Sequence, residues 1–217
     1  NIPRLRFLGR GETGRVEFWV KAKAQIDAFD PKDKNAILRN KILLSEAKEE
    51  FEVKLNSYLS VEQKAYYQDE VFGNSGPLPP RVGEQTTYTI LWLAKNSFND
   101  VKNAKVKTIL PQSLELTGKV FPEEAPLTFD SQSREIVWAA GDLLAGAGIS
   151  SGPVSIAFQV RFSPSAFQQG GAASILGQVS ITGEDAWTIQ TVSGTDLPLT
   201  TTELSDPSFS PDKGIVQ

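Results

Sequence analysis

The residues from Gly9 to Gly14 have the spacing of a phosphate-binding loop. Gly9, Gly11 and Gly14 match the three glycines of the G-x-G-x-x-G pattern. The backbone amides of that loop hold a pyrophosphate when a strand precedes it and a helix follows it. Here the following residues alternate between apolar and polar, which is typical of a strand. We therefore interpret these glycines as a turn and expect no nucleotide cofactor.

The other side chains that could do chemistry are mainly carboxylates. The chain has no His and no Cys, which removes the commonest general base, the thiolate nucleophile and the zinc-thiolate site. The adjacent acids Glu49–Glu50 and Glu123–Glu124 lie in extended segments, where neighbouring side chains point to opposite faces. Neither couple can therefore act as an acid–base pair. We expect no catalytic residues and no enzymatic activity.

Calcium is the one metal that the sequence leaves open. Several acidic residues fall in expected loops and would offer the oxygen ligands that calcium prefers. They are Asp100, Asp130, Asp142, Asp206 and Asp212. No Asp-x-Asp-x-Asp-Gly loop accompanies them, so we assign no metal ligand and no other cofactor.

Alternation of apolar and polar residues dominates the chain and predicts β-strands. It runs through residues 16–26, from Phe51 to Leu55, and most clearly from Val154 to Phe162. We expect Trp92 and Trp138 to pack in the core between two sheets. Many short strands at this spacing, without a strong helix pattern, favour an all-β fold. The prediction is an Ig-like antiparallel β-sandwich.

An internal repeat shapes the expected domain organisation. Residues 14–55 follow the pattern of residues 152–193, an offset of 138 residues (152 minus 14). Strand-like sequence from Glu84 onward precedes the later copy, whereas almost none precedes the earlier one. A truncated repeat indicates a piece of a repeat array. We therefore predict one complete domain preceded by the C-terminal half of a similar domain.

These patterns divide the chain into four segments. Residues 1–60 are predicted to be the C-terminal half of an Ig-like domain, and residues 84–204 the complete domain. Residues 61–83 are predicted to be a strand-like connector that ends in a proline-rich, semi-rigid linker. The Ser-, Asp- and Pro-rich residues 205–217 are predicted to be a second linker or a disordered tail.

The order of turns and strand edges from Val82 onward resembles a known family. A Gly-containing entry at Val82-Gly83-Glu84 leads to the strand Tyr88-Thr89-Ile90, a Leu110-Pro111 exit follows the next strand, and Gly152-Pro153 opens a later one. This order is similar to the conserved-repeat domain of prokaryotic cell-surface proteins, catalogued as the eleventh domain of unknown function. Ser97 and Phe98 stand where that family has a Gly after Asn.

The resemblance covers residues 82–203, and residues 9–55 match the C-terminal half of the family's pattern. It implies tandem Ig-like sandwiches on secreted or cell-wall-associated proteins. The family carries no known catalytic residues, so the resemblance transfers no site residue to this chain.

A half-domain would bury its apolar side chains on one side only. By their alternation, Phe18, Val20, Phe51 and Val53 lie on a core face. Leaving such a side chain in water costs about 1.5–3 kcal/mol, so we expect another layer to cover this face. Trp19 lies on the opposite, polar face, and tryptophan is enriched in interface hot spots. These five residues are our interface candidates, with a missing half-domain, a neighbouring repeat or another subunit as the partner.

Charge and hydropathy argue against nucleic acid as a partner and against a membrane span in this segment. The formal net charge is -4, with 22 basic and 26 acidic residues, which lacks the basic footprint of a nucleic-acid-binding protein. No apolar run reaches the roughly 18 residues that suggest a membrane span. We expect an extracellular or cell-surface protein, anchored through segments outside this sequence.

The function that these features favour is a structural or adhesive module of a cell-surface or secreted repeat protein. We expect it to be completed by, or to assemble with, another chain or a cleaved N-terminal part. The alternative is a glycan- or polymer-binding module of a secreted protein, in which exposed aromatic side chains would make the contact.

Overall fold

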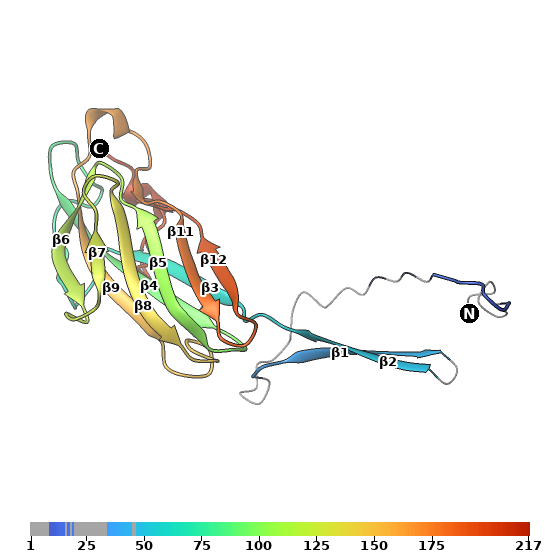
Figure 1. Cartoon of the computed structure of the whole chain (residues 1–217). Coiled ribbons are helices and arrows are strands. Elements are labelled where there is room, and N and C mark those ends of the chain that lie inside the picture. Colours follow the sequence, from blue (N-terminus) through green and yellow to red (C-terminus); the bar gives the residue numbers. More distant parts are fainter. Residues whose placement is uncertain (1–8, 16, 18, 20–33, 45–46) are drawn as a thin grey trace.

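The period-two alternation of the sequence becomes two antiparallel sheets that share one core (Figure 1). The computed structural model describes residues 9–15, 17, 19, 34–44 and 47–217. Within these residues the helical elements are two short 3₁₀ turns, η3 (Ala166–Gln168) and η4 (Pro211–Gly214). The prediction of an all-β, Ig-like antiparallel sandwich is confirmed.

The first sheet has the strand order β3-β4-β9-β6. Its strands are β3 (Leu59–Tyr66), β4 (Thr86–Asn96), β9 (Val154–Phe162) and β6 (Leu114–Phe121). The central strand β4 pairs along its length with β3 on one side and β9 on the other. Near the middle of β4, Ile90 and Trp92 are buried in the core, whereas Leu91 and Leu93 on the outer face are half-buried.

The second sheet has the order β12-β11-β5-β8-β7. Its strands are β12 (Gln190–Asp196), β11 (Val179–Asp185), β5 (Val101–Ile109), β8 (Glu135–Leu143) and β7 (Leu127–Phe129). A small two-stranded sheet, β10 (Ser174–Leu176) with β13 (Leu199–Thr200), lies beside them.

The core lies between the two sheets and is rich in aromatic side chains. Trp92 of β4 is fully buried and packs edge-to-face on Phe158 of β9, with 4.9 Å between ring centroids. Trp138 of β8 is also buried. The alternation predicted for β9 is confirmed, since the buried residues of its core face include Ile156, Phe158, Val160 and Phe162.

The strand order is that of an Ig-type sandwich with an inserted hairpin. In such sandwiches strands A, B, E and D form one sheet and C, F and G the other. Here β3, β4, β9 and β6 occupy the A, B, E and D places, while β5, β11 and β12 occupy those of C, F and G. The extra pair β7–β8 joins the second sheet beside β5, and in the chain it falls between the D and E strands.

The predicted connector over residues 61–83 is wrong in its first part. Residues 61–66 belong to β3, whose eight residues all pair with β4. The proline-rich stretch is therefore the loop that returns the chain from β3 to β4, and it joins no separate domains. Gly76 makes this return possible, because it has a φ of 101° and a Cβ there would collide with the backbone of Gln85.

The predicted tail over residues 205–217 is also wrong, because this segment packs on the sandwich. Val216 is buried, and the backbone of Gln217 pairs with Pro80 and Val82. The buried carboxylate of Asp206 accepts hydrogen bonds from the backbone amides of Tyr67 and Gln68. These bonds give hydrogen-bond partners to the backbone amides where β3 ends. Residues 205–217 are therefore packed against the sandwich and are not a free tail.

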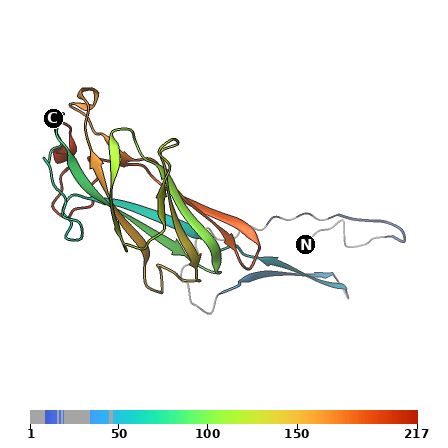
Figure 2. The same ribbon diagram turned by 60° about the vertical axis from the view of Figure 1, so that its left-hand side comes forward.

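A separate two-stranded hairpin, β1 (Ile37–Leu44) with β2 (Ala47–Lys54), precedes the sandwich. Its strands pair only with each other in the described part of the chain. Both views show the hairpin projecting from one end of the sandwich and the C-terminus lying at the other end (Figure 1, Figure 2).

Candidate interaction surfaces

The β1–β2 hairpin has one apolar face that is open to water. Residues directly opposite each other in an antiparallel pair share a face, and the register places Leu38 opposite Val53 and Asn40 opposite Phe51. With Ile42 they form an apolar surface whose large side chains are between 39% and 53% exposed. We call Leu38, Ile42, Phe51 and Val53 the hairpin face.

The opposite side of the hairpin is charged. Arg39 and Glu52 are paired across the strands, with 2.8 Å between Nε and Oε1. Lys41 and Glu50 are opposite each other on the same side and are exposed. The hairpin is therefore mainly apolar on one side, where Asn40 and Glu49 are the polar exceptions, and mainly charged on the other, where Leu43 is 65% exposed. An exposed apolar surface beside a charged one is typical of a protein contact.

The hairpin matches the β11–β12 hairpin of the complete sandwich. Counted from their turns, Leu44 is opposite Ala47 and Asp185 is opposite Gln190. Six residues back from each turn, Leu38 is opposite Val53 and Val179 is opposite Asp196, so the two hairpins pair in the same register.

Their corresponding faces differ in burial. In β11, Val179 and Ile181 lie on that face and are fully buried against the first sheet. In β1 the corresponding residues are Leu38 and Asn40, which are exposed. Both hairpins are regular antiparallel ladders, although Asn40 stands at the position of Ile181. Only the second hairpin is covered by another layer within the described part of the chain.

This match corrects the residue-level repeat. At a constant offset of 138, β1 would align across β10 and the start of β11, and β2 would align across the β11–β12 turn. The structural match instead needs an offset of 141 for β1 (185 minus 44) and 143 for β2 (190 minus 47). The difference arises because the β1–β2 turn is two residues shorter. The half-domain assignment of residues 1–60 stays a prediction.

A buried polar cluster, which we call the joint, fixes the base of the hairpin to the sandwich. Its central residue is Asn99, which is fully buried in the loop before β5. Asn99 Oδ1 accepts a hydrogen bond from the backbone amide of Asn35 at 3.0 Å. Its Nδ2 donates to the carbonyl of Leu55 at 2.8 Å. Asn99 thus holds the residues just before β1 and just after β2, which are themselves linked by Leu55 N to Ala36 O.

Asp185, at the end of β11, completes the joint. Its carboxylate accepts hydrogen bonds from Asn99 Nδ2 at 2.7 Å and from the backbone amide of Ser57 at 2.6 Å. The amides of Trp187 and Thr188 also donate to it. Burial by itself raises the pKa of Asp185, but the hydrogen bonds, that from Asn99 first, outweigh it and lower the pKa below its ordinary value. Asp185 is therefore held as a carboxylate.

Charged contacts surround the joint on the surface. Lys34 Nζ lies 2.6 Å from Asp100 Oδ2. Lys54 Nζ donates to the carbonyl of Trp187 at 3.1 Å and lies 4.1 Å from the centroid of its ring. Such exposed contacts contribute little individually, so the buried hydrogen bonds of Asn99 and Asp185 set the attachment of the hairpin.

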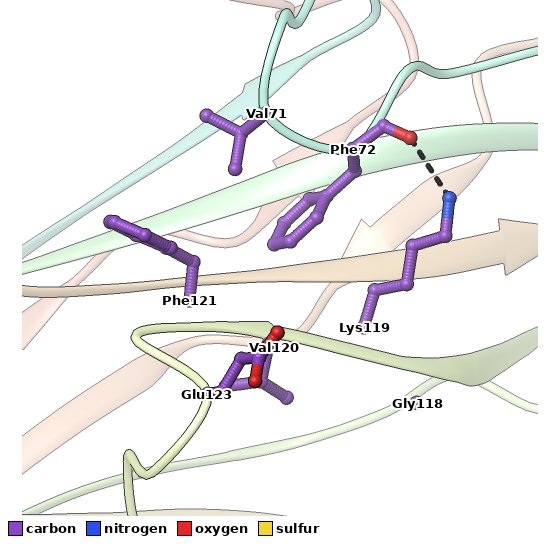
Figure 3. A pocket seen from close by; sticks show the side chains of 7 residues that line it. All are labelled: Val71, Phe72, Gly118, Lys119, Val120, Phe121 and Glu123. Atoms are coloured by element: carbon purple, nitrogen blue, oxygen red, sulfur yellow. Dashed lines mark hydrogen bonds between the residues drawn. The ribbon is translucent and has the colours of Figure 1, made fainter.

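A second surface is a groove on the outer face of the first sheet (Figure 3). It has a volume of about 580 Å³ and lies between the β3–β4 loop, with Val71 and Phe72, and the β6 region from Gly118 to Glu123. Lys119 Nζ donates to the carbonyl of Phe72 at 2.9 Å and ties the two walls together. The ring of Phe121, in the β6 wall, is more than half exposed. The groove therefore offers aromatic rings beside a carboxylate.

The predicted interface residues fall into three groups. Phe51 and Val53 lie on the exposed hairpin face, as their alternation indicated, and Trp19 is 86% exposed. Phe18 and Val20 lie outside the described residues. Leu38 and Ile42 were missed, although the alternation of residues 38–42 could have identified them. Neither the joint nor the groove could be predicted from the sequence, because each combines residues from distant parts of the chain.

The acidic residues considered for calcium have protein partners. Asp100 binds Lys34 and the amide of Ala145, Asp206 caps the end of β3, and Asp130 binds Gln132 and Ser133 within its own turn. Within the part of the chain that the structure describes, no three acidic residues come together as a metal site. None of the described helices is long and apolar enough to cross a membrane.

The comparisons with known proteins are informative about the fold only. No family model matches the sequence, and no curated protein matches it. Among solved structures, the chain is similar to BcpA, the major pilin subunit of Bacillus cereus, at 13% identity and a TM-score of 0.39. That likeness covers 73% of this chain and 50% of the pilin, so this chain spans half the length of that protein.

Two further structures show a likeness of the same order. The full-length major pilin SpaD from Corynebacterium diphtheriae is 13% identical, with a TM-score of 0.41, over 65% of this chain and 35% of the pilin. The RrgA Jo.In complex is 10% identical, with a TM-score of 0.38, over 74% of this chain and 80% of that chain. Identities and TM-scores in this range carry no conclusion about what this chain binds.

Proposed function

We propose that this chain is a structural or adhesive module of a cell-surface or secreted repeat protein, and that it works through protein–protein contacts rather than catalysis. The resemblance to the conserved-repeat domain of prokaryotic surface proteins is part of this proposal. The sandwich supplies a stable unit, and the joint attaches a neighbouring unit that ends with the hairpin.

One observation carries the proposal. The β1–β2 hairpin has the register of β11–β12, yet the face that is buried in β11–β12 is exposed in β1–β2. Covering a large apolar side chain contributes about 1.5–3 kcal/mol, and an open two-stranded edge is prone to add further strands. Both properties favour a polypeptide partner for the hairpin face.

Two experiments test the proposal: one locates the protein in or on the cell, and the other substitutes a residue of the hairpin face. In the native host, protease treatment of intact cells should remove an epitope on the sandwich, or the epitope should appear in the medium. Phe51→Asp should weaken assembly with the partner polypeptide, which native mass measurement detects. The association constant should fall about tenfold for each 1.4 kcal/mol of binding free energy that is lost. Glu52→Gln, on the charged side, is the matched control. Protection of the epitope inside the cell, or unchanged assembly of F51D, would contradict the proposal.

The groove supports a second candidate function, binding of a glycan or another polymer. Phe72 and Phe121 lie in its two walls, with the carboxylate of Glu123 nearby (Figure 3), and aromatic rings beside polar groups are typical of ligand sites. Phe121→Ala should weaken binding to immobilised polysaccharides in this case, whereas Phe129→Ala, on the second sheet, should not. If the native protein and both variants were retained equally on the immobilised polysaccharides, the groove would not be the binding site. Assembly through the hairpin would then be the function that stands.

A further inference from the structure

The groove on the outer face of the first sheet adjoins two further hollows. One, which we call the polar hollow, has a volume of about 410 Å³ and shares Lys119 with the groove. The other, the apolar hollow, has a volume of about 400 Å³ and shares Val71 and Phe121 with it. Figure 3 shows Lys119 and Phe121 on opposite sides of the groove. The three hollows therefore form one elongated site, the extended groove, with the polar hollow at one end.

The polar hollow carries local positive charge, although the whole chain has a net charge of -4. Arg161 and Lys119 line it together with hydroxyl and amide side chains, and no described carboxylate does. The ion-pair partner of Arg161 is Glu115, at 3.8 Å from Nη1, which is beyond hydrogen-bond distance. The guanidinium therefore keeps its N–H donors available for an anionic group, which arginine binds through two parallel hydrogen bonds.

A bulge in the edge strand β6 positions the second cation. The register between β6 and β9 shifts between Leu116 and Val120. Gly118 lies within the shift and has a φ of 88°, a conformation that favours glycine. Such bulges redirect the side chains beside them, and Lys119 reaches across the groove to the carbonyl of Phe72 at 2.9 Å. Lys119 is thereby held between the groove and the polar hollow.

Buried polar side chains fix the floor of the extended groove. Gln159 and Thr89 are 3% and 4% exposed. Gln159 Nε2 donates to Asn74 Oδ1 at 2.8 Å, and Asn74 Nδ2 donates to Thr89 Oγ1 at 3.0 Å. These bonds hold the β3–β4 loop against the sheet, so the site is formed before any ligand arrives. Gln159 lines the polar hollow, and its Oε1 accepts no hydrogen bond within the described part of the chain.

The rest of the extended groove combines aromatic rings with negative charge. Phe72 and Phe121 lie in the two walls, and Phe121 is 56% exposed (Figure 3). Glu123 lines the groove, and Asp69 lines the apolar hollow. A ligand that follows the extended groove thus meets cations at one end only. Its anionic groups should therefore be separated by neutral rings.

The floor of the extended groove suits a glycan better than a peptide. Peptides that bind sheets commonly add a strand to an open edge, where backbone groups are unpaired. This floor is the outer face of β4 and β9, each of which pairs with a strand on both sides. It offers a ligand side chains only, as aromatic rings beside hydroxyl and amide groups. Such a lining fits sugar rings and their hydroxyls.

We propose that the extended groove binds an acidic polysaccharide in which charged sugars alternate with neutral ones. Arg161 and Lys119 hold the anionic group of one sugar in the polar hollow, and the neighbouring neutral sugar lies against Phe72 and Phe121. This inference rests on the second candidate function, polymer binding in the groove. It adds the charge of the polymer and the residues that recognise that charge.

Five immobilised polymers test the proposal with the full chain. Hyaluronan carries a carboxylate on alternate sugars, and keratan sulfate carries its charge as sulfate. Carboxyl-reduced hyaluronan and desulfated keratan are the uncharged forms of the same two backbones. Polyglutamate supplies negative charge on a peptide. The two charged polysaccharides distinguish a carboxylate from a sulfate as the group that is bound.

The variant is Arg161→Gln, and the matched control is Lys107→Gln. Both side chains belong to outer sheet faces and lie near a glutamate, Glu115 or Glu135, and they are 41% and 50% exposed. The native protein should bind at least one charged polysaccharide about tenfold more tightly than its uncharged form, because charge-assisted hydrogen bonds are made only with the former. R161Q should remove that preference, and K107Q should keep it. Urea unfolding checks that both variants are folded.

Three results would overturn the inference. They are equal binding of the charged and uncharged forms, an undiminished preference in R161Q, and binding of polyglutamate as tight as that of the polysaccharides. The last result would show that the site recognises an acidic peptide or any polyanion.

Failure of the inference is distinguishable from failure of either candidate function. If charge makes no difference but Phe121→Ala weakens all the polysaccharides, the groove remains a polymer site and only the recognition of charge fails. If the native protein binds no polysaccharide, polymer binding in the groove fails together with the inference. Assembly of R161Q through the hairpin face, measured by native mass, should match that of the native protein in either case.

Discussion

The side-chain amide of Asn99 lies 2.7 Å from the carboxylate of Asp185, and both groups are fully buried at the base of the projecting hairpin. Through this contact the end of β11 is connected to both ends of the β1–β2 hairpin, because Asn99 also binds Asn35 and Leu55. A single asparagine therefore couples the sandwich to the element before it.

Replacing Asn99 with alanine should weaken that coupling. The variant loses three hydrogen bonds and leaves buried partners unsatisfied, which costs about 1–3 kcal/mol. We expect a lower urea midpoint for the sandwich and faster hydrogen exchange at the backbone amide of Asn35. Asn56→Ala, a nearby exposed asparagine, is the control and should match the native protein. Unchanged exchange at Asn35 in N99A would contradict the role assigned to the joint.

The joint should also give the stability a dependence on acid pH. Folding lowers the pKa of Asp185 below its ordinary value of 3.8. Its stabilising contribution is therefore complete above that value and is lost as the pH falls toward the folded-state pKa. Asp185→Asn should reduce the free energy of unfolding at pH 7 and flatten its decline at acid pH.

Urea unfolding at a series of pH values measures this effect. The difference between D185N and the native protein should shrink as the pH falls below 3.8. Glu184→Gln, the exposed carboxylate next in the chain, is the control. A difference that is constant from neutral to acid pH would show that ionisation of Asp185 does not contribute.

The hydroxyl of Tyr88 is a feature of the core that should be dispensable. It is buried and has no hydrogen-bond partner within the described part of the chain. Burial, and then the nearby Tyr67, raise its pKa, so it stays neutral. Tyr88→Phe should leave the stability unchanged or raise it by up to about 1 kcal/mol, because an unpaired polar group is removed.

Tyr67→Phe is the matched comparison for Tyr88→Phe. The Tyr67 hydroxyl donates to the carbonyl of Gly76 at 2.6 Å, so its loss should lower the stability by about 0.5–1.5 kcal/mol. Thermal unfolding of both variants separates the two cases. A destabilised Y88F would indicate that the hydroxyl of Tyr88 has a partner.

The close approach of β12 to β3 gives a fourth prediction. A Cβ at Gly194 would collide with the backbone of Leu59 and Ser60. Gly194→Ala should therefore force the two sheet edges apart and cost about 1–3 kcal/mol. Gly152→Ala is the control, since a Cβ there meets nothing within 4 Å. Equal urea midpoints for the two variants would show that the edges can separate freely.

Much of the fold could be predicted from the sequence because a half-buried strand leaves a period-two signature. The burial of the inward residues of β9 followed from that signature, and the burial of Trp92 and Trp138 followed from the tendency of large aromatic side chains to pack in a core. The position of β3 as a strand of this sandwich could not be predicted, although the alternation of its residues is visible in the sequence. The proline-rich loop after it resembles an interdomain linker, and only pairing with β4 shows that the chain returns to the same sheet.

The candidate surfaces were predictable to a smaller extent. Phe51 and Val53 follow from local alternation, which needs no knowledge of distant residues. The joint brings Asn99 to Asp185 across 86 positions in the chain, and its polar side chains look like those of any surface turn. Similarly, Phe72 and Phe121 lie in opposite walls of the groove only because a loop folds over the outer face of the first sheet.

The direction of β3 determines how the sandwich would respond to tension. The strand begins beside the joint and ends where Asp206 and the C-terminal segment pack, so it spans the length of the sandwich (Figure 1). A pull between these ends would shear β3 along β4, loading all eight residue pairs together instead of opening them one by one. Resistance to forced unfolding depends on the unfolding rate, so this strand would act as the mechanical clamp of the unit.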